Sequence, residues 1–307
     1  EIFHNSNKLR KFYKNNNENW RRRMNDSKLK ELLKIYEEAS KCILCKKFSR
    51  RSSKEGTYDG LINFFNEKNL YLNIPSIWTD WVNRSNSKIM IVGQDWGPYV
   101  DMQKYNAQYK ELVEMGETKE SAWKTIVNEK ESMTKCLMTE FVIRSAKQCG
   151  IDIDEKIMES CFTTNAVLCA RKGKNYRGTN NFSAKFCTEN CTKMLNKQIN
   201  VIHPLVVITL GYWPFYSVCK YHNIPVYKTL KENISHYSLN KENIINISYE
   251  NNPIYVLPVY HPVAQVKKGE QISLYKIMWE ILLRYYSKDT LINELSTYEY
   301  CREELNL

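Results

Sequence analysis

A carboxylic acid, a carboxamide and an imidazole, three groups that can act together in catalysis, each follow an apolar run of this sequence. The runs and the polar residues after them are Lys88–Val92 with Asp95, Cys161–Thr163 with Asn165, and Ile254–Tyr260 with His261. Short apolar runs bounded by turn formers are typical of buried β-strands. In an open α/β sheet, ligands bind beyond the carboxyl ends of the strands, where residues distant in sequence can meet. We therefore expect these three polar residues to line one site.

The elements that must position these residues alternate along the chain. Leu205–Leu210 is an uninterrupted apolar run, as expected for a parallel strand covered on both faces. Helical patterns precede and follow the apolar runs, at 137–148, 184–202, 212–221 and 271–286. We expect an α/β fold, a three-layer sandwich with a central, mainly parallel four-stranded sheet and helices on both faces.

We expect a single domain over residues 26–290. A basic N-terminal arm would occupy residues 1–25 and a C-terminal tail residues 291–307. Two polar, weakly patterned segments, near 99–131 and 223–252, are predicted to be insertions in the domain.

Composition indicates a polyanionic partner. The 307 residues carry 45 Lys and Arg against 34 Asp and Glu, a formal charge of +11. Such an excess favours binding to DNA or RNA, although a solvated basic surface alone would explain it. No apolar run has the length of a membrane span, and the first residues lack the apolar core of a signal peptide. We expect a soluble, cytoplasmic monomer without a membrane partner.

Ten cysteines are unusual for a reducing compartment, where disulfides are disfavoured. Cys42 and Cys45 have the spacing that lets two thiolates bind one metal centre. Cys169 ends the strand that carries Asn165, and Cys191 lies in the following helix, where Cys187 is an alternative ligand. A zinc site, or no metal at all, would also be compatible with the Cys-x-x-Cys pair alone.

The order of the motifs is similar to that of a known family. Gly93-Gln94-Asp95-Trp96-Gly97-Pro98, then Thr164-Asn165-Ala166-Val167, then His261-Pro262 resemble the motifs of the uracil-DNA glycosylase superfamily. The resemblance extends from about Cys42 to the helix that ends near Tyr286. In the iron–sulfur branch of this superfamily, a four-iron four-sulfur (4Fe-4S) cluster is held by cysteines at positions matching Cys42, Cys45, Cys169 and Cys191. The resemblance implies a structural cluster of this kind.

The resemblance also implies roles for the polar residues. Asp95 would orient a water and stabilise a cationic sugar, and His261 would donate a hydrogen bond to the pyrimidine O2. Asn165 would bind the Watson–Crick edge of a base extruded from DNA. Gln94 stands where the iron–sulfur branch has Glu, so the chain combines features of two branches. Backbone N–H groups around Gln94 would add to the anion site.

The expected reaction is hydrolysis of an N-glycosidic bond in DNA, leaving an abasic site. No lysine is placed for a Schiff base, which favours a monofunctional enzyme. Gly97 stands where the Gly-Gln-Asp-Pro-Tyr form of the motif has a tyrosine that blocks C5 of the pyrimidine. The substrate would be uracil or a C5-modified pyrimidine, including the bulky modified cytosines of some phage genomes, which would imply a role in phage defence. Trp96, Tyr99 and Phe141 are candidates for stacking on the base.

The segment after His261 is predicted to contact DNA. It resembles the loop that enters the minor groove beside the flipped base, with Gln265 or Val266 as the wedge and Lys267 and Lys268 near the phosphates. Two hypotheses of other classes are a non-catalytic DNA-binding module that keeps the cluster, and a zinc protein that binds RNA through a basic face. The simultaneous presence of Asp95, Asn165 and His261 argues against the first.

Overall fold

The structure is a computed structural model. It describes residues 27–42, 44, 61–62, 86–95, 107–108, 110–117, 122, 125, 133–171, 184–248 and 252–296, and every structural statement below refers to these residues. The predicted arm at 1–25 lies outside them, as do Cys45, Trp96, Gly97 and Tyr99.

The core is a five-stranded sheet in the order β3-β2-β5-β7-β6. Its strands are β2 (Ile89–Gly93), β3 (Phe162–Asn165), β5 (Val206–Leu210), β6 (Ile245–Asn246) and β7 (Tyr255–Val259). The first four strands of this order pair in parallel, as the sequence predicts, and only β6 is antiparallel. The carboxyl ends of the four parallel strands therefore meet at one edge.

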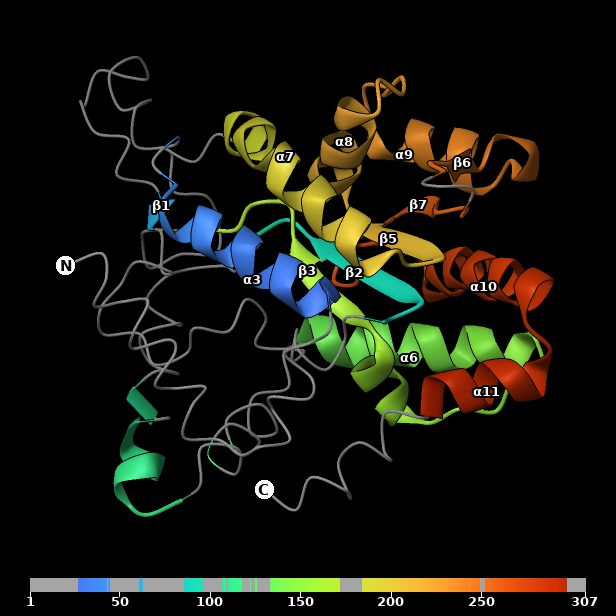
Figure 1. Cartoon of the computed structure of the whole chain (residues 1–307). Coiled ribbons are helices and arrows are strands. Elements are labelled where there is room, and N and C mark those ends of the chain that lie inside the picture. Colours follow the sequence, from blue (N-terminus) through green and yellow to red (C-terminus); the bar gives the residue numbers. More distant parts are fainter. Residues whose placement is uncertain are drawn as a thin grey trace.

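Helices cover both faces of the sheet and form three layers (Figure 1). One layer contains α3 (Ser27–Ser40), α7 (Ala184–Ile202) and α8 (Tyr212–Tyr221). The other contains α6 (Met133–Gln148), α10 (Lys268–Tyr285) and α11 (Lys288–Ser296), with the short 3-10 helix η4 (Glu155–Ser160) beside them. The predicted three-layer α/β architecture is confirmed.

The alternation of strand side chains explains the two apolar cores. In β2, Ile89 and Ile91 pack against the α6 and α10 layer, whereas Met90 and Val92 pack against the α3, α7 and α8 layer. Successive side chains of a strand point to opposite faces, so a strand covered by helices on both sides must be apolar throughout. All five residues of β2 are accordingly buried.

The segment 223–252 adds a strand to the sheet, which the sequence analysis did not predict. Its described part contains α9 (Leu230–Asn233), the π turn η5 (Ile234–Ser238), the 3-10 turn η6 (Lys241–Asn243) and β6. Thr229 begins α9 with a capping box, in which its side chain and that of Glu232 bond each other's backbone N–H. The expectation of four strands is corrected to five because β6 pairs with the edge of β7.

Two further elements lie at the margins of the fold. β1 (Leu61–Ile62) pairs antiparallel with β4 (Ala170–Arg171), directly after Cys169. α11 crosses the boundary expected at residue 290, and its Leu291 and Leu295 are buried in the core of the α6 and α10 layer. The packed part of the chain thus extends at least to Ser296. Among the described residues, no helix combines the length and the apolar character needed to cross a membrane.

Candidate active site

The ends of β2 and β3 are held in one register beyond the strands themselves. Gly93 is opposite Asn165 in the parallel pair. The backbone N–H groups of Ala166 and Val167 then donate to the carbonyl oxygens of Gly93 and Gln94, at 2.8 and 2.9 Å. These bonds fix the Gln94-Asp95 segment beside the Asn165 strand end.

Gly93 is required by the position of the Asn165 side chain. The two residues point to the same face of the sheet, and a Cβ atom at position 93 would overlap the Asn165 Oδ1 atom. The Asn165 side chain occupies this space and is only 6% exposed. The sequence predicted Asn165 as a site residue, but it gave no sign that Gly93 makes room for the amide, because that depends on the register of two distant strands.

Gln94 and Asp95 form a joined pair at the end of β2. The Gln94 Nε2 atom donates to Asp95 Oδ2 at 2.9 Å, and both residues are partly exposed. The hydrogen bond leaves the second carboxylate oxygen, Oδ1, outside this pair and orients the carboxyl group. The Gln94 amide therefore has a direct structural role, which is to orient the Asp95 carboxylate.

His261 lies one residue past Tyr260 at the end of β7, and its backbone is held from two sides. Its carbonyl oxygen accepts hydrogen bonds from Ala264 N at 2.8 Å and from Gln271 Nε2 of α10 at 3.1 Å. Burial lowers the pKa of the imidazole below its ordinary value of 6.5, and the negative charge of Asp95 opposes this shift. The imidazole is consequently neutral at pH 7, and Asp95 is close enough for its charge to act on it.

β5 lies between β2 and β7 and determines the separation of Asp95 and His261. At its end, Gly211 has φ of +100°, a conformation that favours glycine, and its N–H donates to the Val259 carbonyl at 2.9 Å. α8 begins immediately after this glycine. The chain thus turns away sharply beside the site, and the first residues of α8 lie at the same edge of the sheet.

The arrangement combines an oriented carboxylate, a neutral N–H donor and a nearly buried amide. A carboxylate can orient a water molecule and stabilise positive charge, while a neutral imidazole can donate to an oxygen that gains negative charge. The amide can pair with both a donor and an acceptor on a planar ligand. These are the groups needed to separate a heterocyclic base from a sugar.

The loop after His261 has the predicted exposure but a different apolar residue at its surface. Gln265, Lys267 and Lys268 are exposed, and Lys268 forms an ion pair with Glu140 at 3.2 Å. Val266 is partly buried, whereas Val263 is 47% exposed. Among the described apolar side chains of this loop, Val263 is therefore the more exposed, and the wedge predicted at Gln265 or Val266 stays a prediction.

Phe141 is not available to stack on a ligand. It is 2% exposed, belongs to the core of the α6 and α10 layer, and packs against the ring of Tyr275 at 6.0 Å. Its selection as a stacking candidate was therefore wrong. The other candidates, Trp96 and Tyr99, lie outside the described residues, as does Gly97.

Three of the predicted or alternative cysteine ligands lie together. Cys187 and Cys191 of α7 form a small cluster with Val167, and Cys169 packs against it. Cys42 follows α3, which packs along α7 (Figure 1). Within the described residues no three His, Cys, Asp or Glu side chains are arranged to hold a single metal ion, and Cys45 is not among those residues. The set of thiols brought together is the donor type that an iron–sulfur cluster uses.

Other residues near the site were missed because nothing in their local sequence marks them. Gln271 is 1% exposed and lies within a helical pattern, so its bond to His261 depends on how α10 docks. Tyr212, Trp213 and Tyr216 form mutual ring contacts at the start of α8. Their sequence signal was visible as an aromatic-rich helix start, but their place at the site edge follows from the sheet order.

The fold and the site define an α/β protein with an acid, an amide and a histidine at the carboxyl edge of a parallel sheet, the edge at which sheets of this kind bind their ligands. The sequence model of the uracil DNA glycosylase superfamily matches residues 79–283, from before β2 to the last turn of α10. Because this is more than half of the chain, the protein belongs to that superfamily. A direct comparison with curated proteins gives no match. Membership assigns the chain to the DNA glycosylases, hydrolases that release a base from DNA.

Proposed function

We propose that this protein is a monofunctional DNA glycosylase that acts on uracil or on a C5-modified pyrimidine. The observation that supports it most directly is the pairing of Asp95 and His261 across β5, close enough for the Asp95 charge to affect the imidazole, with the Asn165 amide on the neighbouring strand. The excess of 45 Lys and Arg over 34 Asp and Glu favours a polyanionic substrate.

In the proposed reaction the base is extruded from the DNA and its Watson–Crick edge pairs with the Asn165 amide. Water attacks C1′ of the sugar, the bond from C1′ to the base nitrogen breaks, and the bonding electrons leave with the base. Asp95 orients the water and stabilises the cationic sugar. His261, neutral because of its burial, donates its N–H to the pyrimidine oxygen that gains negative charge. After release, the base nitrogen that was bonded to C1′ takes up the proton that the water loses.

The substrate range within this proposal depends on position 97. Glycine there leaves the C5 side of a pyrimidine sterically open, which favours bases with large C5 substituents. None of the four side chains Gln94, Asp95, Asn165 and His261 is an amine, so the proposal is hydrolysis and not Schiff-base chemistry.

The test is a panel of oligonucleotides that differ only in the target base: uracil, thymine and cytosines with small and large C5 substituents. Alkali-labile abasic sites are scored after incubation with the purified protein. We expect cleavage at uracil, at a C5-modified base, or at both. Failure to release any base, under conditions in which the protein binds the same DNA, would instead support a non-catalytic DNA-binding module.

We further propose that Cys42, Cys45, Cys169 and Cys191 hold a 4Fe-4S cluster, with Cys187 as the alternative to Cys191. The proposal is supported by the shared position of Cys169, Cys187 and Cys191, and by the packing of α3 on α7. The cluster would supply a structural cross-link, because its ligands come from segments far apart in the chain. These cysteines then connect the N-terminal helix to the Asn165 strand.

A further inference from the structure

The first two turns of α8 carry three aromatic residues whose role the proposed reaction does not explain. Tyr212 and Trp213 contact edge to face with ring centroids 5.0 Å apart, Tyr212 and Tyr216 are stacked at 6.1 Å and 19°, and Trp213 meets Tyr216 at 5.6 Å. All three are partly exposed. We call Tyr212, Trp213 and Tyr216 the α8 aromatic cluster.

These rings do not belong to the apolar core. The side of α8 that packs into the core consists of Phe215, Val218 and Cys219, all fully buried. The outward face of a helix is normally polar, so a group of partly exposed aromatic rings there is suited to binding a planar apolar ligand. The α8 aromatic cluster therefore requires an explanation other than folding.

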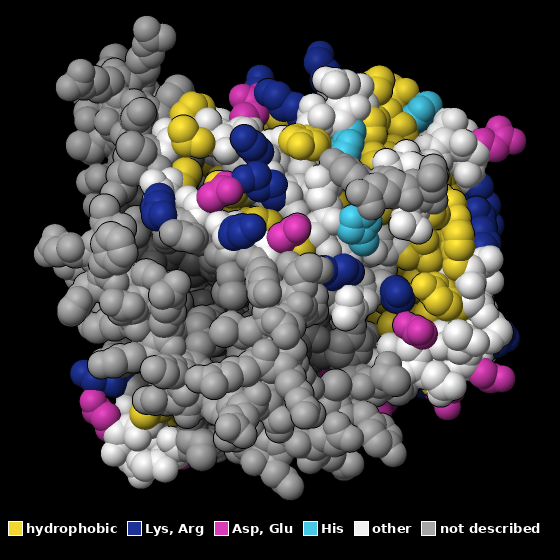
Figure 2. Space-filling view, viewed as in Figure 1, with side chains coloured by type: hydrophobic (Ala, Val, Ile, Leu, Met, Phe, Trp, Pro, Cys, Tyr) yellow, Lys and Arg dark blue, Asp and Glu magenta, His cyan; other side chains and the backbone are white. Residues whose placement is uncertain are grey.

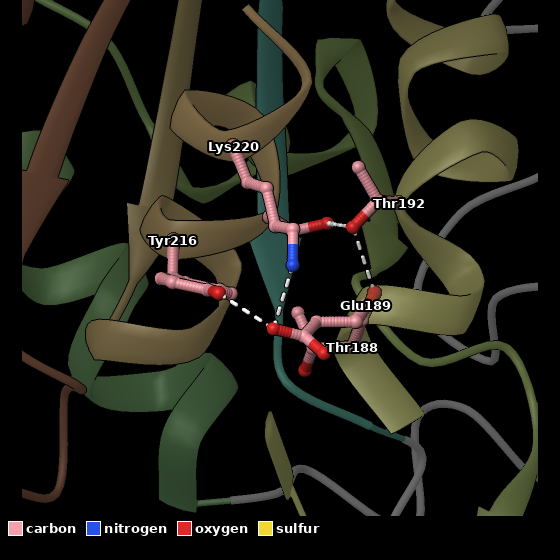
Figure 3. A network of polar contacts seen from close by, with 6 residues as sticks. Thr188, Glu189, Thr192, Tyr216 and Lys220 are labelled. Atoms are coloured by element: carbon pink, nitrogen blue, oxygen red, sulfur yellow. Dashed lines mark hydrogen bonds and ion pairs between the residues drawn. The ribbon is translucent and has the colours of Figure 1, made fainter. Parts of the chain in front are cut away.

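A polar network holds one ring of the cluster, that of Tyr216, in place (Figure 3). The Tyr216 hydroxyl and the Lys220 ammonium group both donate to Glu189 Oε1 of α7, each at 2.7 Å. Burial of Glu189 tends to raise its pKa, but the hydrogen bonds from Lys220 and Tyr216 outweigh burial and lower it, so the carboxylate stays ionised. Lys220 also lies 5.6 Å from the centre of the Tyr216 ring.

The same network joins the two helices below the rings. Thr192 Oγ1 donates to the Thr188 carbonyl at 2.8 Å, and Ser217 Oγ of α8 lies 3.2 Å from Thr192 Oγ1. A ring surface that is held in place before a ligand arrives loses little conformational freedom on binding. Tyr216 is therefore held in place before a ligand arrives, and Tyr212 and Trp213 both contact its ring.

The position of the cluster relates it to the site. α8 starts at Gly211, whose N–H is bonded to Val259, two residues before His261. Asn165, however, lies opposite Gly93 and points to the α6 and α10 side of the sheet, whereas α8 covers the other side. The cluster therefore lies on the other side of the sheet from the Asn165 amide, and the start of α8 lies at the same edge of the sheet as His261.

The chemistry of the surface favours a nucleobase over a phosphate. The charge of Lys220 is already paired with Glu189. On the described part of the face drawn in Figure 2, basic and acidic side chains are interspersed. A planar base gains stability by stacking on aromatic rings irrespective of its sequence, and it must be unpaired and exposed to do so. A base within an intact duplex offers no free ring face.

We propose that the α8 aromatic cluster stacks an unpaired nucleobase next to the target nucleotide, and that the protein thereby prefers single-stranded or locally opened DNA. This inference rests on the proposed function, which makes the neighbouring site the place of the target nucleotide. The binding of the unpaired base, however, needs no catalysis. The rings act together with Glu189, which fixes Tyr216, and with Lys220, which neutralises Glu189.

The test measures equilibrium binding of an oligothymidylate and of a matched duplex, neither of which contains a uracil or a C5 substituent larger than methyl. A single 2-aminopurine at successive positions of the strand reports stacking by quenching of its fluorescence. The variants are Trp213→Ala, with Tyr212→Leu as a milder change should the first fail to fold. Tyr221→Ala is the matched control, because Tyr221 is on the same helix and 40% exposed but lies in its last turn.

We expect Trp213→Ala and Tyr212→Leu each to weaken single-strand binding on the order of tenfold and to reduce the 2-aminopurine quenching. Duplex binding and the Tyr221→Ala protein should be unaffected. Tyr216→Phe, which keeps the ring but loses the bond to Glu189, should bind more strongly than Tyr216→Ala.

Two results would overturn the inference: unchanged single-strand affinity in folded Trp213→Ala and Tyr212→Leu proteins, or equal weakening for single strand and duplex. Absence of single-strand binding by the wild type would also overturn it. Because equilibrium binding is measured without any need for base release, a protein that binds the oligothymidylate as expected but releases no base of the panel would leave this inference standing and remove the proposed glycosylase activity.

Discussion

The substitution Gly93→Ala tests whether the Asn165 amide works from the place where the structure holds it. An added Cβ at position 93 overlaps the Asn165 Oδ1 atom, and restoring an ordinary carbon to oxygen contact requires a shift of about 1 Å. The amide is at the end of a short side chain, so it moves more easily than the two backbones, whose register is fixed by the bonds at Ala166 and Val167.

A displacement of about 1 Å in a group that positions a substrate can reduce the rate on the order of a hundredfold. At about 1.4 kcal/mol for each factor of ten, this corresponds to roughly 2.8 kcal/mol of lost transition-state stabilisation. The fold should be much less affected, with a change in melting temperature below about 4 °C, because no core side chain is removed.

The assay is single-turnover base release with protein in excess over the best substrate of the oligonucleotide panel. Gly269→Ala is the matched control, since a Cβ there meets no atom within 4 Å. Asn165→Ala and the double variant complete the set. Because Asn165→Ala removes the atom that the new Cβ would meet, the double variant should be no slower than Asn165→Ala alone.

Two results would refute this reasoning. A rate for Gly93→Ala within threefold of wild type would show that base release tolerates displacement of the amide. A double variant that loses the full product of the two single effects would show that Gly93 acts through a different contact.

Four other predictions follow from the site. Asp95→Asn should slow base release by about a hundredfold or more while DNA binding persists, and it should lower the pKa of His261 further, which a histidine NMR titration measures. Burial places the pKa of His261 below 6.5, and the neutral imidazole is the proposed donor. We therefore expect kcat/KM to be independent of pH above pH 6.5 and to fall as the pH drops through the lowered pKa of His261. The unfolded chain binds that proton more readily, so the free energy of unfolding also declines below pH 6.5, and circular dichroism must show folded protein at each point. Cys191→Ser should lower the iron content and the visible absorption of anaerobically purified protein. If Cys187→Ser loses iron and Cys191→Ser does not, Cys187 is the fourth ligand of the cluster instead of Cys191. Gly97→Tyr should abolish release of bases with large C5 substituents and spare release of uracil, and equal loss of both activities would contradict steric exclusion at C5.

The parts of the fold that the sequence predicts well are those in which local pattern and burial agree. The helices at 184–202 and 212–221 have the expected bounds, and the parallel strands differ from the expected runs by a few residues at their ends. A strand covered on both faces is apolar along its whole length, and Gly or Pro marks its end, so it is visible in a single sequence.

The elements that were missed depend on contacts that local pattern does not encode. β6 is only two residues long and is defined by its pairing with β7, so it is too short to show a periodic pattern in the sequence. α11 was taken for a tail because its mean character is polar, although Leu291 and Leu295 give it one buried side. Phe141 was taken for a ligand contact because an aromatic residue in a helical pattern has the same sequence signal in a core and in a site.

The site itself shows the same division between residue type and register. That the strand ends next to Asp95, Asn165 and His261 meet at one edge was predictable, because strand ends of a parallel sheet converge whatever the register. The fit of Asn165 over Gly93 was not predictable, since it requires β3 to pair with β2 at one particular offset.

A slip of one residue in the pairing of β3 with β2 would turn the Asn165 side chain to the opposite face of the sheet, toward α7. β3 has only four residues to prevent such a slip, and the bonds from Ala166 and Val167 to Gly93 and Gln94 extend the ladder by two residues. The same two bonds hold Asp95 beside Asn165, so the backbone that fixes the register also fixes the distance between the proposed base-binding amide and the proposed catalytic carboxylate.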